Sequence, residues 1–313
     1  MNVNFAIFLI LFLPLISCSQ AQIKNRPIIL IDAGHDQNSS GAIGYNGVSE
    51  VVYNDEMAKM IKDEAQNKKL CFDIQLTREK GTLPYEKINE LKKNYPEYFR
   101  PESLSENEIS LSTSLRYRSA LADSLDAQLL ISIHHDSVSP QFLKTNLVLL
   151  NGKLVIAYTA TTQFYEKYHS GQTILVSSKL NTNIFPKNNE QLSAEKYSKS
   201  LVFAKLVGEK MLHNSPSEKE KRLPSNYHLD DYLYQGRTYS DIDKSLGIID
   251  GQEEIGILIS SKTPALIIEL GLMTDPKDLE FVRSNAFRKE FIKNLLTSIQ
   301  EYLRTDEKCL PSL

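Results

Sequence analysis

The fold of this protein is indicated first by residues 28–36, which read IILIDAGHD. The run begins with four consecutive aliphatic residues, as in a strand that is buried on both faces of a sheet. The chain then turns at Gly34 and presents the imidazole of His35. A single loop histidine usually packs there and bonds a carbonyl, so a function for His35 requires partners from elsewhere in the chain.

Strand-like and helix-like patterns alternate along the rest of the sequence. This alternation predicts an α/β fold: a single domain with a mostly parallel twisted sheet, helices on both faces, and inserted loop and helix segments. The expected strands cover residues 28–31, 71–77, 128–133, 154–158 and 265–268, and the expected helices cover residues 49–66, 111–125, 194–213 and 286–303.

Two inserts interrupt this alternation, at about residues 80–108 and 160–250. The first is rich in Lys, Glu, Tyr and Pro, which predicts a surface excursion rather than a core element, with a helical pattern in Tyr85–Tyr98. A flap over a functional site and an inert decoration both remain open for this insert. We expect the domain to span residues 27–304, followed by a tail of residues 305–313.

The N-terminus predicts an export signal. An apolar run from Phe5 to Ile16 is too short to cross a bilayer but fits the core of a signal peptide, although no basic residue precedes it. Two processing sites remain open. Removal of residues 1–17 would leave a lipidated Cys18, whereas removal of residues 1–21 would leave a soluble protein. Both place the mature protein outside the cytoplasm, in the periplasm or cell envelope, and the first makes it a lipoprotein.

Composition narrows the class of protein. The 313 residues carry a net charge of −3, with 41% hydrophobic and 24% charged residues, as in ordinary globular proteins. Lysine and arginine are scattered, whereas a nucleic-acid-binding protein shows a basic face, so we exclude nucleic acid as a partner. Besides Cys18, the chain contains Cys71 and Cys309, which can pair in an oxidising compartment, although the sequence does not show that they are close.

Three of the predicted strands are followed by a group that can bind a metal or move a proton. These groups are His35, His134 and Glu269, and Glu50 adds a carboxylate at the start of the helix after the first strand. A carboxylate in that first turn also simply favours the helix dipole. Because the carboxyl ends of parallel strands meet at one edge of a sheet, we expect the four groups to converge. Two imidazoles and a carboxylate are a common catalytic zinc set, and a second carboxylate can act as the base.

Five stretches together resemble the bacterial zinc-dependent N-acetylmuramoyl-L-alanine amidases. They are IILIDAGH, GAIGYNGVSE, LTR, LRYRSALADSLDAQLLISIHHD and TPALIIELGLMTDPKD, and they cover most of residues 27–136 and 263–303. The resemblance implies three zinc ligands, which are His35, Glu50 and His134, and one catalytic residue, which is Glu269. The chain departs from the family pattern where GHDQ replaces the usual GHGG, and where a histidine follows the motif SIH.

Other polar residues near these motifs have competing interpretations. His135 can replace His134 as a ligand, but His134 shares a strand face with Ser132 and is the residue that the resemblance favours. Asp136 can orient a ligand imidazole from behind, or it can be a turn residue. Asp32 and Arg118 are expected to be structural.

The resemblance also implies a function. It predicts an exported zinc amidase that hydrolyses the amide bond between N-acetylmuramic acid and L-alanine in peptidoglycan. The alternatives are a zinc peptidase that acts on peptidoglycan stem peptides and a non-catalytic cell-wall binding or regulatory protein of the same fold. The expected cofactor is Zn²⁺, the expected partner is peptidoglycan or its muropeptides, and no protein activator is identified.

Overall fold

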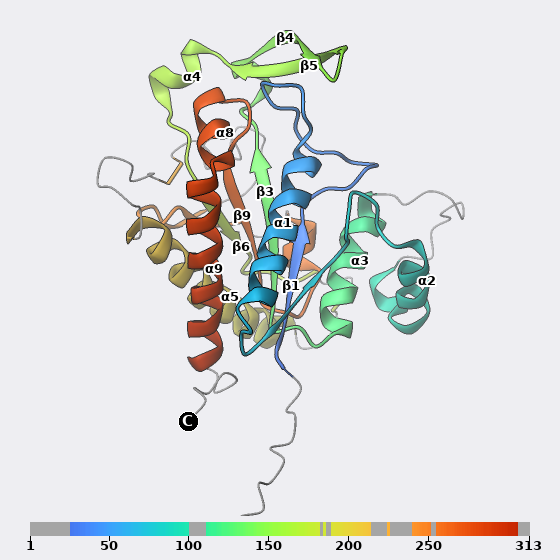
Figure 1. The fold of residues 1–313 in the computed structure, drawn as a ribbon. Helices are drawn as coiled ribbons and strands as arrows, with labels where there is room; N and C mark the ends of the chain where they lie inside the picture. The colour runs from blue at the N-terminus through green and yellow to red at the C-terminus, as the bar shows by residue number, and fades with distance from the viewer. Residues whose placement is uncertain are drawn as a thin grey trace, which may run out of the picture.

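A seven-stranded sheet with the strand order β2-β1-β3-β9-β6-β8-β7 forms the centre of the molecule (Figure 1). Four of its six neighbouring pairs are parallel, and β6–β9 and β7–β8 are antiparallel, so the predicted mostly parallel sheet is confirmed. The computed structural model describes residues 26–99, 111–181, 184–185, 189–213, 224–225, 240–251 and 255–305. The strands are β1 (Ile28–Ala33), β2 (Asp73–Leu76), β3 (Leu129–Asp136), β6 (Thr173–Val176), β7 (Ser240–Asp243), β8 (Ile248–Asp250) and β9 (Ala265–Leu272).

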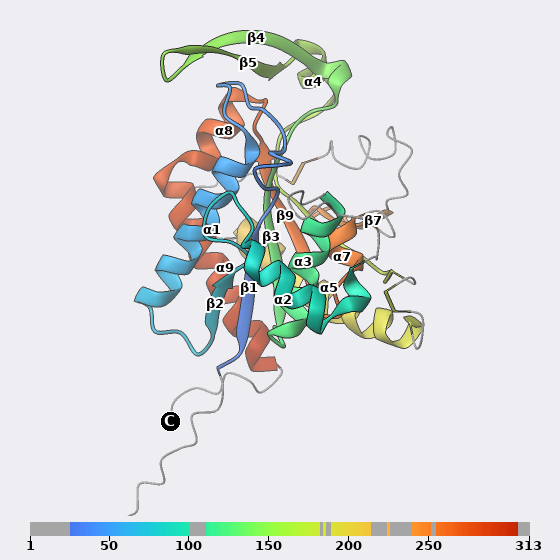
Figure 2. The same cartoon turned by 90° about the vertical axis from the view of Figure 1, so that its right-hand side faces the viewer.

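Helices cover both faces of this sheet (Figures 1 and 2). Ile29 and Ile31 of β1 join the core on one face, and Leu30 joins the core on the other. Because both faces are buried, the strands are apolar without alternation, which is why they are visible in the sequence as continuous runs. The first face is covered by α1 (Glu50–Asn67), α5 (Asn189–His213) and α9 (Asn285–Thr305), and the second by α2 (Tyr85–Asn94), α3 (Leu111–Ser124) and α7 (Gly256–Ile259).

Strands β3 and β9 run past the ends that the sequence predicts. His134 and Glu269 lie directly opposite each other in the parallel pairing, and the pairing resumes at Asp136 and Leu272 after a register shift. The two functional side chains therefore project from the sheet itself and not from loops beyond it. A polar residue ends the apolar run in the sequence, but the hydrogen bonds between the strand backbones continue through it.

The first insert is in part a core element, so the expectation of a surface excursion is wrong for the buried residues of its helix α2 and of the turn that follows it. Ile88 and Leu91 of α2 are buried with Tyr98 of the short helix η1 (Pro96–Tyr98), and they pack in the core that includes α3. The helical pattern in the sequence is confirmed. Residues 100–110 lie outside the described residues, so the flap hypothesis is untested for them.

A second, two-stranded sheet lies at the carboxyl end of the parallel strands (Figure 2). It is the antiparallel hairpin of β4 (Leu143–Leu150) and β5 (Lys153–Ala160), and helix α4 (Thr162–Lys167) follows it. The turn between the strands, Asn151-Gly152, has φ values of 50° and 78°, as two-residue hairpin turns require. A further helix, α8 (Pro276–Arg283), begins after Asp275, whose side chain accepts hydrogen bonds from two backbone amides of the first turn.

The ends of the chain carry predictions that stay open. The signal sequence, Cys18 and Cys309 lie outside the described residues. Cys71 is disulfide-bonded, and the sequence left open whether it pairs with Cys309. In the described residues, no helix has both the length and the apolar character that crossing a membrane requires.

One lysine in the core makes stability depend on pH. Lys196 of α5 is 3% exposed, and its ammonium donates to the carbonyl of Leu258. Burial lowers the pKa of Lys196 to about 7, and the charge of Asp123 offsets this only in part. Between pH 7 and the ordinary lysine pKa, the unfolded chain keeps a proton that the folded chain has released. The free energy of unfolding should therefore rise with pH in this window, by about 1.4 kcal/mol per pH unit from this group.

We expect Lys196→Met to remove this contribution. Denaturant unfolding of both proteins at pH 6 to 9.5 should give a stability difference that favours the variant most at pH 6 and shrinks as pH rises. Lys199→Met, at an exposed residue of the same helix that pairs with Glu195, is the matched control. A stability difference that does not change with pH would contradict the assignment.

Candidate functional site

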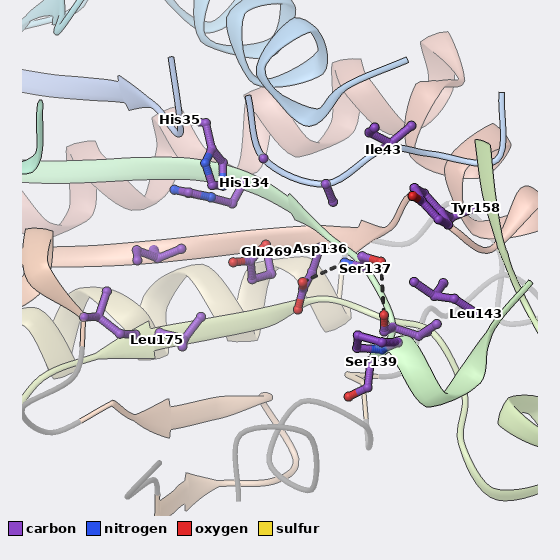
Figure 3. Close-up of a pocket in the computed structure, with 16 residues that line it drawn as sticks. His35, Ile43, His134, Asp136, Ser137, Ser139, Leu143, Tyr158, Leu175 and Glu269 are labelled. Atoms are coloured by element: carbon purple, nitrogen blue, oxygen red, sulfur yellow. Dashed lines mark hydrogen bonds between the residues drawn. The ribbon is translucent and has the colours of Figure 1, made fainter. Parts of the chain in front are cut away.

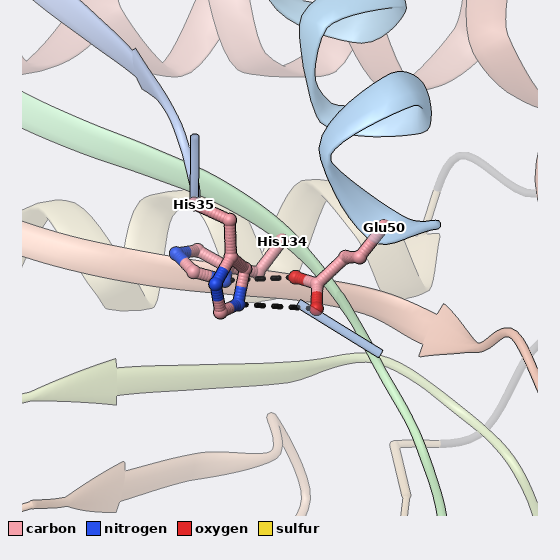
Figure 4. A group of neighbouring side chains, drawn as sticks. All are labelled: His35, Glu50 and His134. Carbon is pink, nitrogen blue, oxygen red and sulfur yellow. Dashed lines mark hydrogen bonds and ion pairs between the residues drawn. The ribbon is translucent and has the colours of Figure 1, made fainter. Parts of the chain in front are cut away.

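Three of the predicted groups meet where β1 and β3 approach the start of α1 (Figure 4). His35 Nε2 lies 3.1 Å from Glu50 Oε2, and His134 Nδ1 lies 2.9 Å from Glu50 Oε1. One ligand atom from each of the three side chains falls within 4.8 Å of the other two. Because a carboxylate only accepts hydrogen bonds, each imidazole donates to it. Two imidazoles and a carboxylate at this spacing are a donor set that fits zinc.

The position of His35 depends on a strained backbone and a buried support. Its φ is 64°, in the left-handed region that side-chain-bearing residues seldom adopt. The guanidinium of Arg118 donates to the His35 carbonyl and forms a 2.8 Å ion pair with Asp32. Asp32 also accepts hydrogen bonds from Thr77 and Ser132, each at 2.6 Å. Asp32 and Arg118 are therefore structural, as expected, and they hold the turn that presents His35.

Glu50 is oriented by the backbone and by a neighbouring amide. The Ala42 backbone amide donates to Oε2 at 3.1 Å, while the Asn54 side chain and the His135 backbone amide donate to Oε1 at 3.1 and 3.2 Å. The carboxylate is 3% exposed. A buried carboxylate with this many donors is held in one orientation, which preorganises the site.

The charges at the site support one another. Burial raises the pKa of Glu50, but hydrogen bonds and charges from His134 and His35 outweigh it and hold that pKa well below its usual range. Burial lowers the pKa of His35, and the hydrogen bond and charge of Glu50 outweigh it, so the net pKa is raised. The cluster therefore keeps an anionic carboxylate between two imidazoles. A divalent cation can bind there by replacing the protons that the imidazoles share with the carboxylate.

Glu269 lines a pocket of about 580 Å³ beside this cluster (Figure 3). The side chain is 8% exposed, and its Oε2 atom has no hydrogen-bond partner among the described residues. Burial raises the pKa of Glu269 well above its usual range, and the charges of Asp136 and Glu50 raise it further. A pocket carboxyl with a free oxygen and a raised pKa has the properties of a group that accepts and returns a proton.

His135 and Asp136 lie in different places. The His135 ring is buried, and its Nδ1 lies 2.8 Å from the side-chain oxygen of Asn54, behind Glu50. It is not among the residues that line the pocket. Asp136 lines the pocket near Glu269, where its charge acts on that carboxyl, and it accepts a 2.6 Å hydrogen bond from the Ser137 amide. His135 is not part of the cluster of possible metal ligands, and the role of Asp136 in orienting a ligand imidazole stays a prediction.

The sequence did not predict two features of the site, which are the hydrogen bond of Asn54 to Glu50 and the hairpin residues that line the pocket. Asn54 lies one helical turn after Glu50, so the same helix face carries both, and this spacing was a usable signal. Leu143 and Tyr158 of the hairpin also line the pocket. No local pattern predicts that placement, because the hairpin reaches the pocket only through the tertiary fold.

Gly34 leaves the space that the His134 ring fills. A β-carbon on Gly34 would lie 2.1 Å from His134 Nε2, which is closer than any real contact. We expect Gly34→Ala to displace the ring and to weaken metal binding at least about tenfold, measured by titration of the metal-free protein. Gly152→Ala is the control: it strains the left-handed backbone of the hairpin turn, where φ is 78°, but its β-carbon meets nothing within 4 Å, so metal affinity should not change. Equal metal affinity in the Gly34 variant and the wild type would show that the ring is placed differently.

Comparison with known proteins agrees with these observations. Residues 29–301 match the model of the family described as N-acetylmuramoyl-L-alanine amidase. A curated relative from Buchnera aphidicola subsp. Acyrthosiphon pisum (strain APS), provisionally named N-acetylmuramoyl-L-alanine amidase, is 23% identical over 274 residues. That match covers 88% of this chain and 93% of the relative.

Solved structures share the fold. The match to the N-acetylmuramyl-L-alanine amidase Ami1 of Mycobacterium smegmatis has a TM-score of 0.51 and 16% identity, and it covers 89% of this chain and 97% of the solved chain. The amidase CwlD of Clostridioides difficile, solved in complex with the GerS lipoprotein, matches with a TM-score of 0.50 and 14% identity, over 90% of this chain and all of CwlD. Identities this low support the α/β fold alone.

Proposed function

This chain belongs to the N-acetylmuramoyl-L-alanine amidase family, and from that premise we propose that it is a zinc-dependent hydrolase of peptidoglycan. The bond it would cleave joins N-acetylmuramic acid to L-alanine. Family membership supports amidase activity, and the bond and the metal are our proposal. The observation that carries it is the clustering of His35, Glu50 and His134, whose two histidines line the same pocket as Glu269.

We assign the metal to His35, Glu50 and His134. A zinc ion there would lower the pKa of a bound water toward neutrality and polarise the scissile carbonyl. The chain's own part is to orient these ligands, through Arg118 behind His35 and through the donors around Glu50.

Glu269 is the proposed proton carrier. Its side chain lines the pocket and has a carboxyl oxygen without a hydrogen-bond partner among the described residues. Its raised pKa suits a group that takes a proton from the attacking water and gives it to the departing alanine nitrogen. Asp136, whose charge raises that pKa, is a positioning residue in this scheme. The pocket of about 580 Å³ has the usual size of a ligand site and is lined by both polar and aliphatic groups.

The proposed location is the cell envelope. We assign residues 1–21 to a signal peptide, or residues 1–17 to a lipoprotein signal with lipidation at Cys18, and residues 27–304 to the catalytic domain. Metabolic labelling with a fatty acid, compared between the wild type and Cys18→Ala, distinguishes the tethered form from the soluble one. Label on the wild type alone assigns lipidation.

Product analysis tests the activity. Purified sacculi are digested with the enzyme, and the products are identified by mass spectrometry. Free lactyl ends on N-acetylmuramic acid together with intact stem peptides are the expected result. Shortened stem peptides would assign a zinc peptidase instead, and binding without any product would assign a non-catalytic cell-wall protein.

A further inference from the structure

The hairpin of β4 and β5 exposes four large aliphatic side chains on one face. Leu147 lies directly opposite Ile156, and Leu149 lies opposite Leu154, so the four share that face. They are exposed by 68%, 49%, 71% and 70%, in the same order. We call these four residues the hairpin strip. Contiguous apolar patches on soluble proteins mark sites of interaction.

The hairpin strip continues into the pocket. Leu143 and Tyr158 lie on the same face of the hairpin, because side chains two residues apart along a strand share a face, and both line the pocket with Glu269 (Figure 3). From Tyr158 to Leu154 the strip extends the pocket outward by roughly 14 Å, at the usual rise of a strand. Any molecule longer than the pocket that leaves it on this side meets the strip.

The opposite face of the hairpin fixes the strip in place. Val148 and Val155 pack on that face against Gly47, where a β-carbon would lie 2.4 Å from Val155. The Tyr158 amide also donates to the Gly44 carbonyl at 3.3 Å. The strip is therefore preformed, so binding to it costs little ordering of the protein.

We propose that the hairpin strip binds the peptidoglycan polymer next to the unit that is being cleaved, an inference that rests on the proposed function. The strip is aliphatic and carries no charge. It suits the methyl groups that the family's substrate carries in its acetyl, lactyl and alanyl units. A small muropeptide fills only the pocket, whereas the polymer also covers the strip, so the strip favours polymer over fragments.

Two other occupants fit less well. A stable dimer buries about 800 Å² and roughly 20–30 residues on each partner, whereas the strip consists of four residues. A membrane surface seated on the strip would also close the pocket, because the strip and the pocket share one face of the hairpin.

The test uses the double variant Leu149→Ser/Leu154→Ser in the full mature chain. Binding to purified sacculi is measured by co-sedimentation in a Glu269→Gln background, and kcat/KM is measured on sacculi and on a soluble muropeptide with Glu269 intact. We expect binding to sacculi to weaken at least fivefold, and the ratio of kcat/KM on sacculi to that on muropeptide to fall by a similar factor. Val202→Ser, at a 46% exposed residue of α5, is the matched control and should change neither.

Several results would overturn the proposal. The first is equal binding to sacculi by the variant and the wild type, and the second is no binding to sacculi by the wild type. The third is a variant that loses sacculus binding because a dimer dissociates, as seen by sedimentation velocity. The fourth is a variant that also loses the wild type's binding to phospholipid vesicles. If the double variant does not fold, Leu147→Ser/Ile156→Ser replaces it. Co-sedimentation measures binding and does not require turnover, so the two proposals can fail separately. If the wild type binds sacculi through the strip but releases no lactyl ends, the proposed function is wrong and the proposal for the strip stands.

Discussion

Replacing Glu269 by Gln is expected to lower kcat by on the order of a hundred- to ten-thousand-fold, the usual contribution of a general acid–base group. Gln has nearly the same shape, so the packing on β9 should persist, but its amide cannot take a proton from water and return it to a leaving nitrogen. Glu269 is not one of the three clustered ligands. Zinc content, measured by mass spectrometry of the purified variant, should therefore remain at the wild-type level.

The comparison variant is Asp136→Asn. Asp136 raises the pKa of Glu269 through its charge but is not assigned a proton. Its loss should lower the pKa of Glu269, shift the acid limb of the kcat profile to lower pH and leave most of the turnover at neutral pH. If Glu269→Gln retained full activity while Asp136→Asn lost it, the base would have to be Asp136.

Replacing His134 by Ala is expected to remove the metal and to lower activity by at least about a thousandfold, since several kcal/mol of transition-state stabilisation depends on the ion. In the wild type we expect one zinc per chain, with metal–nitrogen distances of about 2.0–2.1 Å. The fold should survive, because Glu50 keeps its hydrogen bonds from Ala42, Asn54 and the His135 amide. Chelation should likewise abolish activity and leave the core intact.

His169→Ala is the matched control for this variant. The His169 ring is exposed, and its Nε2 lies 2.9 Å from the Pro224 carbonyl, outside the cluster. Zinc content and activity should both match the wild type. A His134 variant that still binds one zinc with unchanged affinity would show that the ligand set is wrong, and a crystal structure of the zinc form would then identify the true ligands.

The sequence predicted the α/β class, the first strand, α1, α3, α9 and the four residues of the candidate site. These features have strong local signals: long apolar runs, helical periodicity, and a metal-binding or proton-moving residue at each break in a run. It missed the short strands β6, β7 and β8, because three or four residues carry too little periodicity to separate a strand from a loop. It also placed the ends of β3 and β9 too early, at Ile133 and Ile268, because backbone pairing continues through polar residues.

The sequence determined part of the candidate site, and the tertiary structure determined the rest. The residue types His, Glu, His and Glu, and their order after successive strands, belong to the sequence, since parallel strands bring their ends to one edge whatever the details of packing. The sequence also favoured His134 over His135, since neighbouring strand residues point to opposite faces. Only the tertiary structure decided what each ring contacts: His134 meets Glu50, and His135 meets Asn54. The tertiary structure alone also brought Tyr158 and the hairpin strip to the pocket, because contacts so distant in sequence arise from the packing of whole elements and leave no local pattern.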